Sequence, residues 1–268
     1  MNDLTAAVIL GLVQGLTEFL PVSSTAHLIL VSGALGLDPE KFGLSFDVAL
    51  HLGTALAVLL YFAGTWIGLV KDVFARRWQM PLLVIVGTLP AAIAGVLFES
   101  TVSTALRAPI WIVAGLIIGS VIFVLAERAA TQRRAMTELS LGDALIMGAA
   151  QAVALLPGIS RSGITISTGL FRGLRREDAT RFSFLLATPV ILGAGAKTLL
   201  DARKAAELFS APDVLAVGFV VSFASGLAAV AFLVRFLRTH SLIWFVVYRL
   251  LLAAFVLLTV TLGWPRAA

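Results

Sequence analysis

The residues best suited to chemistry lie in two short segments of an otherwise apolar chain. Residues 14–28, QGLTEFLPVSSTAHL, contain an acid, hydroxyls, a histidine and a proline. Residues 151–168, QAVALLPGISRSGITIST, repeat the order of an apolar stretch, a proline break and hydroxyls, and Arg161 adds a positive charge. Ionisable groups inside a bilayer are costly unless they pair or line a water-filled cavity. The two segments therefore predict one shared functional site.

A helix that resumes after each break suits an anion such as phosphate. Its first backbone N–H groups lack intrahelical partners and carry partial positive charge. The guanidinium of Arg161 can bind two phosphate oxygens at once. Hydroxyls near both breaks can donate to the same anion, and they are Ser23, Ser24, Thr25, Ser160, Ser162 and Thr165.

Glu18 repels phosphate, so its presence indicates either proton transfer or a divalent cation, Mg²⁺ or Ca²⁺, that joins carboxylate to phosphate. Gln14 lies one helical turn earlier and could add a carbonyl ligand to the metal or a hydrogen bond to the substrate. His27, three residues after Ser24, can lie beside that hydroxyl and activate it as a nucleophile. Arg161 then stabilises the transition state. The expected catalytic residues are Glu18, Ser24, His27 and Arg161.

Other polar residues are interpreted structurally. We read His51 as a packing residue and Asp47 as an acid at a helix start, with a supporting role at the site as the alternative for Asp47. Lys197 and Arg249 are expected to extend toward the membrane interface. The remaining residues are assigned to cytoplasmic or solvated linkers: Arg172, Arg175, Arg176 and His240.

The composition is that of a polytopic membrane protein. The 268 residues are 59% hydrophobic and 13% charged, and the mean hydropathy is +1.01. The absence of cysteine excludes disulfides and cysteine-ligated metals. The sequence pI is about 10.2, but the basic residues lie between apolar spans, which indicates membrane topology and no nucleic-acid partner.

Six apolar runs are long enough to cross a hydrocarbon core of about 30 Å. They are residues 46–70, 81–98, 109–126, 182–200, 213–234 and 242–263. Segments 4–35 and 141–170 are interrupted by Pro21 and by Pro157-Gly158. We predict that both are re-entrant helical hairpins with their breaks turned inward, because irregular backbone at membrane depth must be buried or face water.

More than half of the 20 lysines and arginines lie in four linkers, 71–77, 128–134, 172–181 and 235–238. These linkers are expected to be cytoplasmic. Both termini then lie outside, and the first hairpin enters from the outer face.

The two halves of the chain align weakly with each other. Gly11 and Gln14 match Gly148 and Gln151 at an offset of 137, whereas Pro21 and Ser24 match Pro157 and Ser160 at an offset of 136. Each half holds one hairpin and three crossings, so the second copy inserts upside down. The prediction is an all-α inverted-topology repeat, about 1–126 and 141–263, within one integral membrane domain spanning 1–268.

Two motifs resemble a known family. TEFLPVSSTAHL at 17–28 and PGISRSGIT at 157–165, together with FDVALHLGT at 46–54, resemble the undecaprenyl-diphosphate phosphatase family associated with bacitracin resistance. The resemblance covers nearly the whole chain. It implies a bacterial inner-membrane hydrolase that removes the terminal phosphate of undecaprenyl diphosphate. Such an enzyme recycles the lipid carrier of peptidoglycan synthesis, uses a divalent cation and has a site that opens to the outer face.

The resemblance also implies roles for individual residues. Glu18 matches the second acid of an E/Q-x-x-x-E motif, and Gln14 stands at the first acid position, which removes one anionic metal ligand. Ser24 and His27 match the serine and histidine of the first motif. The second motif is matched by Ser160, Arg161, Ser162 and Thr165. Either Ser24 or His27 could attack phosphorus; Ser24 is favoured, with His27 as base.

Two functions remain open. One is hydrolysis of a prenyl diphosphate lipid; the alternative is an inverted-repeat transporter or flippase for an anionic lipid or solute, because paired broken helices are common in transporters. The nucleophile and base favour chemistry. The sequence lacks the K-x6-R-P, P-S-G-H and S-R-x5-H-x3-D motifs of vanadium-haloperoxidase-like phosphatases. Gly115, Gly119 and Ser120 allow close helix contact, within the monomer or in a homodimer.

Overall fold

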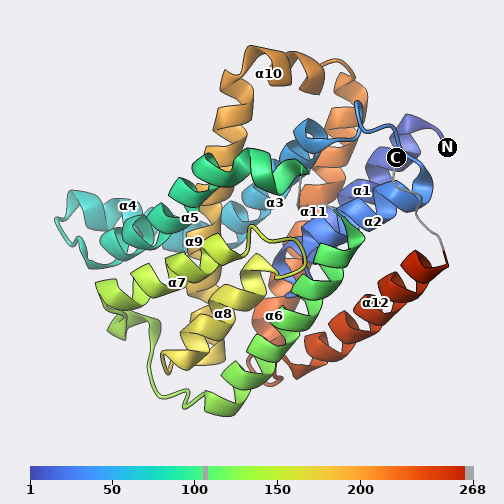
Figure 1. Ribbon diagram of the computed structural model, residues 1–268. Coiled ribbons are helices and arrows are strands. Elements are labelled where there is room, and N and C mark those ends of the chain that lie inside the picture. The colour runs from blue at the N-terminus through green and yellow to red at the C-terminus, as the bar shows by residue number, and fades with distance from the viewer. Residues whose placement is uncertain (105–107, 263–268) are drawn as a thin grey trace.

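A computed structural model describes residues 1–104 and 108–262, apart from the side chains at 99–104, 204 and 207 (Figure 1). Within this part the regular structure is helical, with one isolated β-bridge between Arg134 and Leu174. The helices are α1 (Asp3–Phe19), α2 (Ser24–Leu35), α3 (Leu44–Tyr61), α4 (Ala63–Phe74), α5 (Gln79–Thr104), α6 (Pro109–Ala129), η1 (Met136–Glu138), α7 (Leu141–Val153), α8 (Arg161–Phe171), α9 (Arg176–Leu200), α10 (Ala202–Leu208), α11 (Pro212–Phe236) and α12 (Ile243–Thr261).

Six of the described helices are long and apolar enough to cross a membrane, which confirms the predicted all-α, multi-pass class. These segments are Leu44–Tyr61, Gln79–Phe98, Pro109–Ala129, Arg176–Leu200, Pro212–Phe236 and Ile243–Thr261. The ends of the predicted spans are shifted, and one predicted span was too long. The run 46–70 is divided at Phe62, which leaves helical geometry at φ −101° and ψ 24°. Phe62 is buried, and its ring packs on Tyr61 and Phe184. The sequence shows no helix breaker at this position.

The order of the helices is the same in the two halves of the chain. Each half begins with two helices on either side of a break, continues with a helix long enough to cross a membrane and a shorter one, and ends with two more membrane-crossing helices, α1–α6 and α7–α12. The first helix of each half packs in the other half, α1 against α11 and α7 against α5. Each half thus supplies a helix that completes the other.

Equivalent glycines permit these two reciprocal contacts. A Cβ atom added to Gly11 on α1 would lie 2.8 Å from the carbonyl oxygen of Gly218 on α11. A Cβ atom added to Gly148 on α7 would lie 2.9 Å from the carbonyl carbon of Gly87 on α5. Both separations are too short for a side chain, so the backbones touch directly.

Replacement of Gly148 by Ala is therefore expected to destabilise the protein. Overpacking of a close contact costs about 1–3 kcal/mol. We expect the melting temperature of the detergent-purified protein to fall by several degrees. Gly68→Ala is the control, because a Cβ atom at Gly68 meets no atom within 4 Å. Equal melting temperatures for the two variants would contradict the proposed backbone contact.

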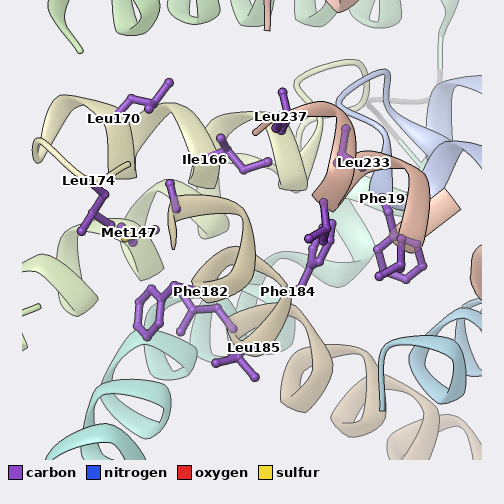
Figure 2. Close-up of a cluster of buried hydrophobic side chains, with 14 of the residues drawn as sticks. Phe19, Met147, Ile166, Leu170, Leu174, Phe182, Phe184, Leu185, Leu233 and Leu237 are labelled. Carbon is purple, nitrogen blue, oxygen red and sulfur yellow. The ribbon is translucent and has the colours of Figure 1, made fainter. Parts of the chain in front are cut away.

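The largest apolar cluster fixes the helices that carry the two motifs (Figure 2). Phe19, at the end of α1, packs edge-on against Phe184 of α9, with ring centroids 5.2 Å apart. Met147 of α7 and Ile166 of α8 belong to the same buried cluster, as does Leu233 of α11. Because the cluster joins α1, α7 and α8 through α9, it holds the two motif segments at fixed positions.

Three of the four basic linkers meet at one end of the molecule, and arginines of two of them pair with buried acids. Asp143, at the start of α7, accepts hydrogen bonds from Arg134 at 2.8 Å and from Arg172 at 2.6 Å. The hydrogen bond to Asp143 raises the pKa of the Arg134 guanidinium above its ordinary value. Arg176 pairs with Glu127 at 2.5 Å. Arg172 and Arg176 were predicted as linker charges alone; the structure adds a packing role, because each neutralises a buried acid.

A cavity of about 560 Å³ opens at this basic end. Arginines from the linkers line it together with two acids of the first turn of α9. The lining residues are Gln132, Arg175, Arg176, Glu177, Asp178, Arg181, Leu237 and Arg238. None of the predicted site residues lines this cavity, so the candidate site lies elsewhere.

Candidate active site

Two interruptions of the helices place the candidate residues. Break 1, residues 20–23, separates α1 from α2, and break 2, residues 154–160, separates α7 from α8. Pro21 and Pro157-Gly158 fall inside them, as predicted. Each resumed helix is preceded by a serine with positive φ, Ser23 at 74° and Ser160 at 76°. Residues with a Cβ atom rarely adopt such angles, so the two breaks share one strained backbone conformation.

This shared conformation corrects the predicted alignment of the halves. Ser23 and Ser160 both stand at the N-cap, 137 residues apart. Ser24 and Arg161 are therefore equivalent first residues of α2 and α8, and the predicted match of Ser24 with Ser160 was wrong. The error arose because a run of adjacent serines allows the sequence alignment to slip by one residue.

The two breaks lie in direct contact. The backbone N–H of Gly158 donates to the hydroxyl of Ser23 at 3.1 Å, and the hydroxyl of Ser162 donates to the carbonyl of Leu20 at 3.3 Å. Arg161, at the start of α8, forms an ion pair with Glu18, at the end of α1. The predicted meeting of the two motifs is therefore present in the structure.

Glu18 is the centre of the site. One carboxylate oxygen binds Arg161, and the other accepts hydrogen bonds from the Ser24 hydroxyl at 2.6 Å and from the Gln14 amide at 2.9 Å. His51 Nε2 lies 3.3 Å from the same oxygen. Glu18 is only 6% exposed, so these partners replace the water that the carboxylate loses on burial.

The prediction that His51 is only a packing residue was wrong. Its other ring nitrogen, Nδ1, lies 2.6 Å from the backbone carbonyl of Asp47, which orients the ring toward Glu18. One histidine in an apolar run gives no sequence signal for this contact. The placement of Asp47 one turn earlier on α3 gives that residue a supporting position beside the site.

His27 is held by partners other than the predicted one. Its Nδ1 donates to the Ser23 carbonyl at 2.8 Å, so in the neutral ring Nε2 accepts from the Tyr248 hydroxyl at 2.7 Å. The rings of His27 and Tyr248 are stacked, with centroids 5.7 Å apart. Ser24 donates to Glu18 instead, so the predicted Ser24–His27 pair is not formed. Tyr248 was missed, because a tyrosine in a membrane span is usually an interfacial residue.

The structure also corrects the position of Arg249. It was expected to extend toward the membrane interface, but its side chain is fully buried between α6 and the two breaks. The breaks expose backbone carbonyls that no helix satisfies, and the guanidinium supplies their donors.

Four of the six hydroxyls predicted to bind phosphate lie in three different environments. Ser160 caps α8 by accepting from the N–H of Gly163 at 3.3 Å, and its hydroxyl lies 3.2 Å from that of Ser162. Thr25 lies in the first turn of α2 and is exposed. Thr165 points toward α9, where its hydroxyl lies 2.5 Å from that of Ser183. Thr165 therefore does not line the contact between Glu18 and Arg161.

Two buried atoms at this contact have no hydrogen-bond partner among the described residues. They are the second amino group of Arg161, Nη1, and the carbonyl oxygen of Gln14, Oε1. The free donor would bind an anion, and the free acceptor would bind a cation.

The donor set limits how a divalent cation could bind. Among the described residues, no three His, Asp or Glu side chains are placed to hold a metal ion. The oxygen atoms that these residues offer are the Glu18 carboxylate and the Oε1 of Gln14, which has no hydrogen-bond partner among the described residues. This fits a hard cation that takes its remaining ligands from water and from the phosphate of a substrate.

The fold and this site together define a multi-pass membrane protein with a buried, charged site where two broken helices meet. The chain matches the family model described as Bacitracin resistance protein BacA over residues 7–255, and it belongs to this family.

Curated relatives resemble the chain over almost its full length. The chain is 42% identical to an undecaprenyl-diphosphatase of Thermodesulfovibrio yellowstonii, over 96% of this chain and 98% of that protein. It is 45% identical to an undecaprenyl-diphosphatase of Rubrobacter xylanophilus, again over 96% and 98% of the two chains. A third protein of the same name, from Corynebacterium efficiens, is 43% identical over 97% of this chain and 92% of its own length.

Proposed function

We propose that the protein is an integral membrane phosphatase that hydrolyses undecaprenyl diphosphate to undecaprenyl phosphate and inorganic phosphate. The observation that carries the proposal is the joining of Ser24, Glu18 and Arg161 across two helix breaks. A hydroxyl, a carboxylate that accepts its proton and a guanidinium with a free amino group form a minimal phosphoryl-transfer site. The named relatives support the same substrate.

Arg161 binds the terminal phosphate. Its Nη2 is held by Glu18, which leaves the buried Nη1 to donate to a phosphoryl oxygen. The start of α2 has no side-chain cap, so its first backbone N–H groups remain available to donate to an anion beside Ser24. These fixed donors stabilise the charge that builds on the phosphoryl oxygens in the transition state.

Ser24 is the nucleophile in this proposal. Its oxygen forms a bond to the terminal phosphorus while the bridging P–O bond breaks and undecaprenyl phosphate leaves. The hydroxyl proton passes to Glu18, the acceptor 2.6 Å away. Water then attacks the phosphoserine, and inorganic phosphate and the free hydroxyl are produced. The sequence predicted His27 as the base; the hydrogen bonds support Glu18 in that role, with His27 fixed beside Ser23.

A divalent cation, Mg²⁺ or Ca²⁺, is part of the proposal. Glu18 and Gln14 would hold it, and it would neutralise charge on the diphosphate.

We also propose the membrane arrangement predicted from the sequence. The identical helix order and the reciprocal contacts of α1 and α7 support an inverted repeat with two re-entrant hairpins. The ion-paired basic linkers support a cytoplasmic face at that end, in the bacterial inner membrane, with both termini and the site opening outside. Gly115 and Gly119 contact break 2 within the chain, so they do not support a homodimer.

Phosphate release from a prenyl diphosphate tests the function. The detergent-purified protein is assayed with and without a chelator, and phosphate release that the chelator abolishes is expected. Absence of release in every metal condition would exclude the phosphatase. The paired broken helices also suit a transporter. A transporter alone would move a labelled anionic lipid across vesicles without producing phosphate.

Tyr248→Phe is expected to lower turnover modestly. The change removes the hydroxyl that donates to His27 and keeps the stacked ring. His27 holds the Ser23 carbonyl next to Ser24, so the loss of this one hydrogen bond is expected to lower turnover about threefold to tenfold. Tyr61→Phe, at the other tyrosine of the chain, is the matched control and should leave turnover unchanged. A Tyr248→Phe enzyme with normal kcat would show that the contact has no catalytic importance.

A further inference from the structure

Arg249 of α12 donates to both helix breaks at once. Its Nη1 lies 3.3 Å from the carbonyl oxygen of Pro21 in break 1, and its Nη2 lies 2.8 Å from the carbonyl oxygen of Gly158 in break 2. The side chain is fully buried. Carbonyl groups released by a helix break need donors inside a membrane protein, because lipid offers none. One guanidinium therefore satisfies backbone groups from both halves of the chain.

The rest of the guanidinium is fixed to α6, which packs beside α12 (Figure 1). Nη2 also donates to the carbonyls of Gly115 at 3.1 Å and Leu116 at 3.0 Å, and Nε donates to the hydroxyl of Ser120 at 3.1 Å. The guanidinium carbon lies 4.6 Å from the centre of the Phe123 ring. These carbonyl dipoles and the ring face provide a complete set of neighbours for a buried cation.

Glycines on α6 create the space for this contact. A Cβ atom at Gly119 would lie 3.1 Å from the guanidinium carbon of Arg249 and 2.8 Å from the carbonyl oxygen of Ile159. A Cβ atom at Gly115 would lie 2.9 Å from the Cα atom of Gly158. Any side chain at Gly119 therefore pushes against both Arg249 and break 2.

We propose that Arg249 is a positioning residue that holds break 1 and break 2 at a fixed distance from each other. Gly119, which has no side chain, leaves the space that the guanidinium requires. Ser24 follows break 1 and Arg161 follows break 2, so their relative position depends on the distance between the breaks. This proposal rests on the proposed phosphatase activity. It adds a residue outside the two motifs to those on which catalysis depends. Misplacement of reacting groups by about 1 Å can cost up to about 10²-fold in rate.

The test uses the full-length protein in detergent and two measurements. Arg249→Met removes the donors while keeping a long apolar side chain, Arg249→Lys keeps the charge, and Gly119→Ala displaces the guanidinium. Gly95→Ala is the matched glycine control, because its added Cβ atom meets nothing within 4 Å. Hydrogen exchange is measured in peptides that cover residues 20–26 and 154–163, and kcat and KM are measured with a prenyl diphosphate.

We expect exchange to rise at least tenfold in both peptides for Arg249→Met and Gly119→Ala, with peptides from α3 and α11 unchanged. We expect kcat to fall about thirtyfold in Arg249→Met with KM within about threefold of wild type, and Arg249→Lys to be intermediate. Gly95→Ala should match wild type in both measurements.

Unchanged exchange, or a rise in only one of the two peptides, would overturn the proposal. If Arg249→Met fails to fold, Gly119→Ala decides the question in the same way. If the wild-type protein releases no phosphate, the proposed function fails, while the exchange measurements still establish or refute the coupling of the breaks by Arg249.

Discussion

Replacement of Glu18 by Gln is expected to lower phosphate release by roughly 10³-fold or more, the scale seen when one member of a catalytic unit is removed. The glutamine has the same shape, but it no longer carries the charge that pairs with Arg161 or the oxygen that accepts the proton of Ser24. It also leaves a guanidinium buried without its counter-ion, which is costly. The loss should appear in kcat, because the proton must be accepted in the transition state.

Glu40→Gln is the control for Glu18→Gln. Glu40 is exposed in the loop that leads to α3, so the same chemical change there should leave kcat and KM unchanged. Circular dichroism of both variants establishes that they are folded. If folded Glu18→Gln retains a tenth or more of wild-type turnover, Glu18 is not the proton acceptor.

Replacement of Arg161 by Lys is expected to lower kcat/KM on the order of 10²-fold, the cost of removing one donor aimed at transition-state charge. Lysine preserves the charge, but its ammonium cannot contact Glu18 and a phosphoryl oxygen in the planar geometry of a guanidinium. The free Nη1 of Arg161 is the donor that is lost.

The matched control for Arg161→Lys is the same substitution at an exposed arginine. Arg133→Lys, in the exposed linker before Arg134, should leave kcat/KM unchanged. Inorganic phosphate is measured as a competitive inhibitor of both variants, and its inhibition constant should rise only for Arg161→Lys. Equal inhibition constants would show that Arg161 does not bind phosphate.

The sequence predicts the spans because membrane crossing depends on local composition. Twenty apolar residues in succession produce a helix whatever their neighbours, and the six predicted crossings are present with shifted ends. The pairing of Glu18 with Arg161 was also predictable, because each buried charge needs an opposite charge and each motif segment contains only one of the two.

The missed residues depend on tertiary contacts that leave no local pattern. His51 and Tyr248 are single polar residues in apolar helices, and each approaches the site from an element remote in sequence. Thr165 was misplaced for the opposite reason. It belongs to the matched motif, but α8 turns its hydroxyl to Ser183. Helix rotation about its own axis is set by packing, here by the contact of α8 with α9.

The reciprocal contacts of α1 with α11 and of α7 with α5 have a consequence for biosynthesis. The first helix emerges from the ribosome long before residues 212–236, the segment it packs against, have been made. During that interval its carboxylate has neither its guanidinium partner nor a finished protein wall around it. Assembly must therefore end with a late docking step after the last crossings have inserted, and a chain truncated before α11 should be degraded because its N-terminal helix never acquires its neighbour.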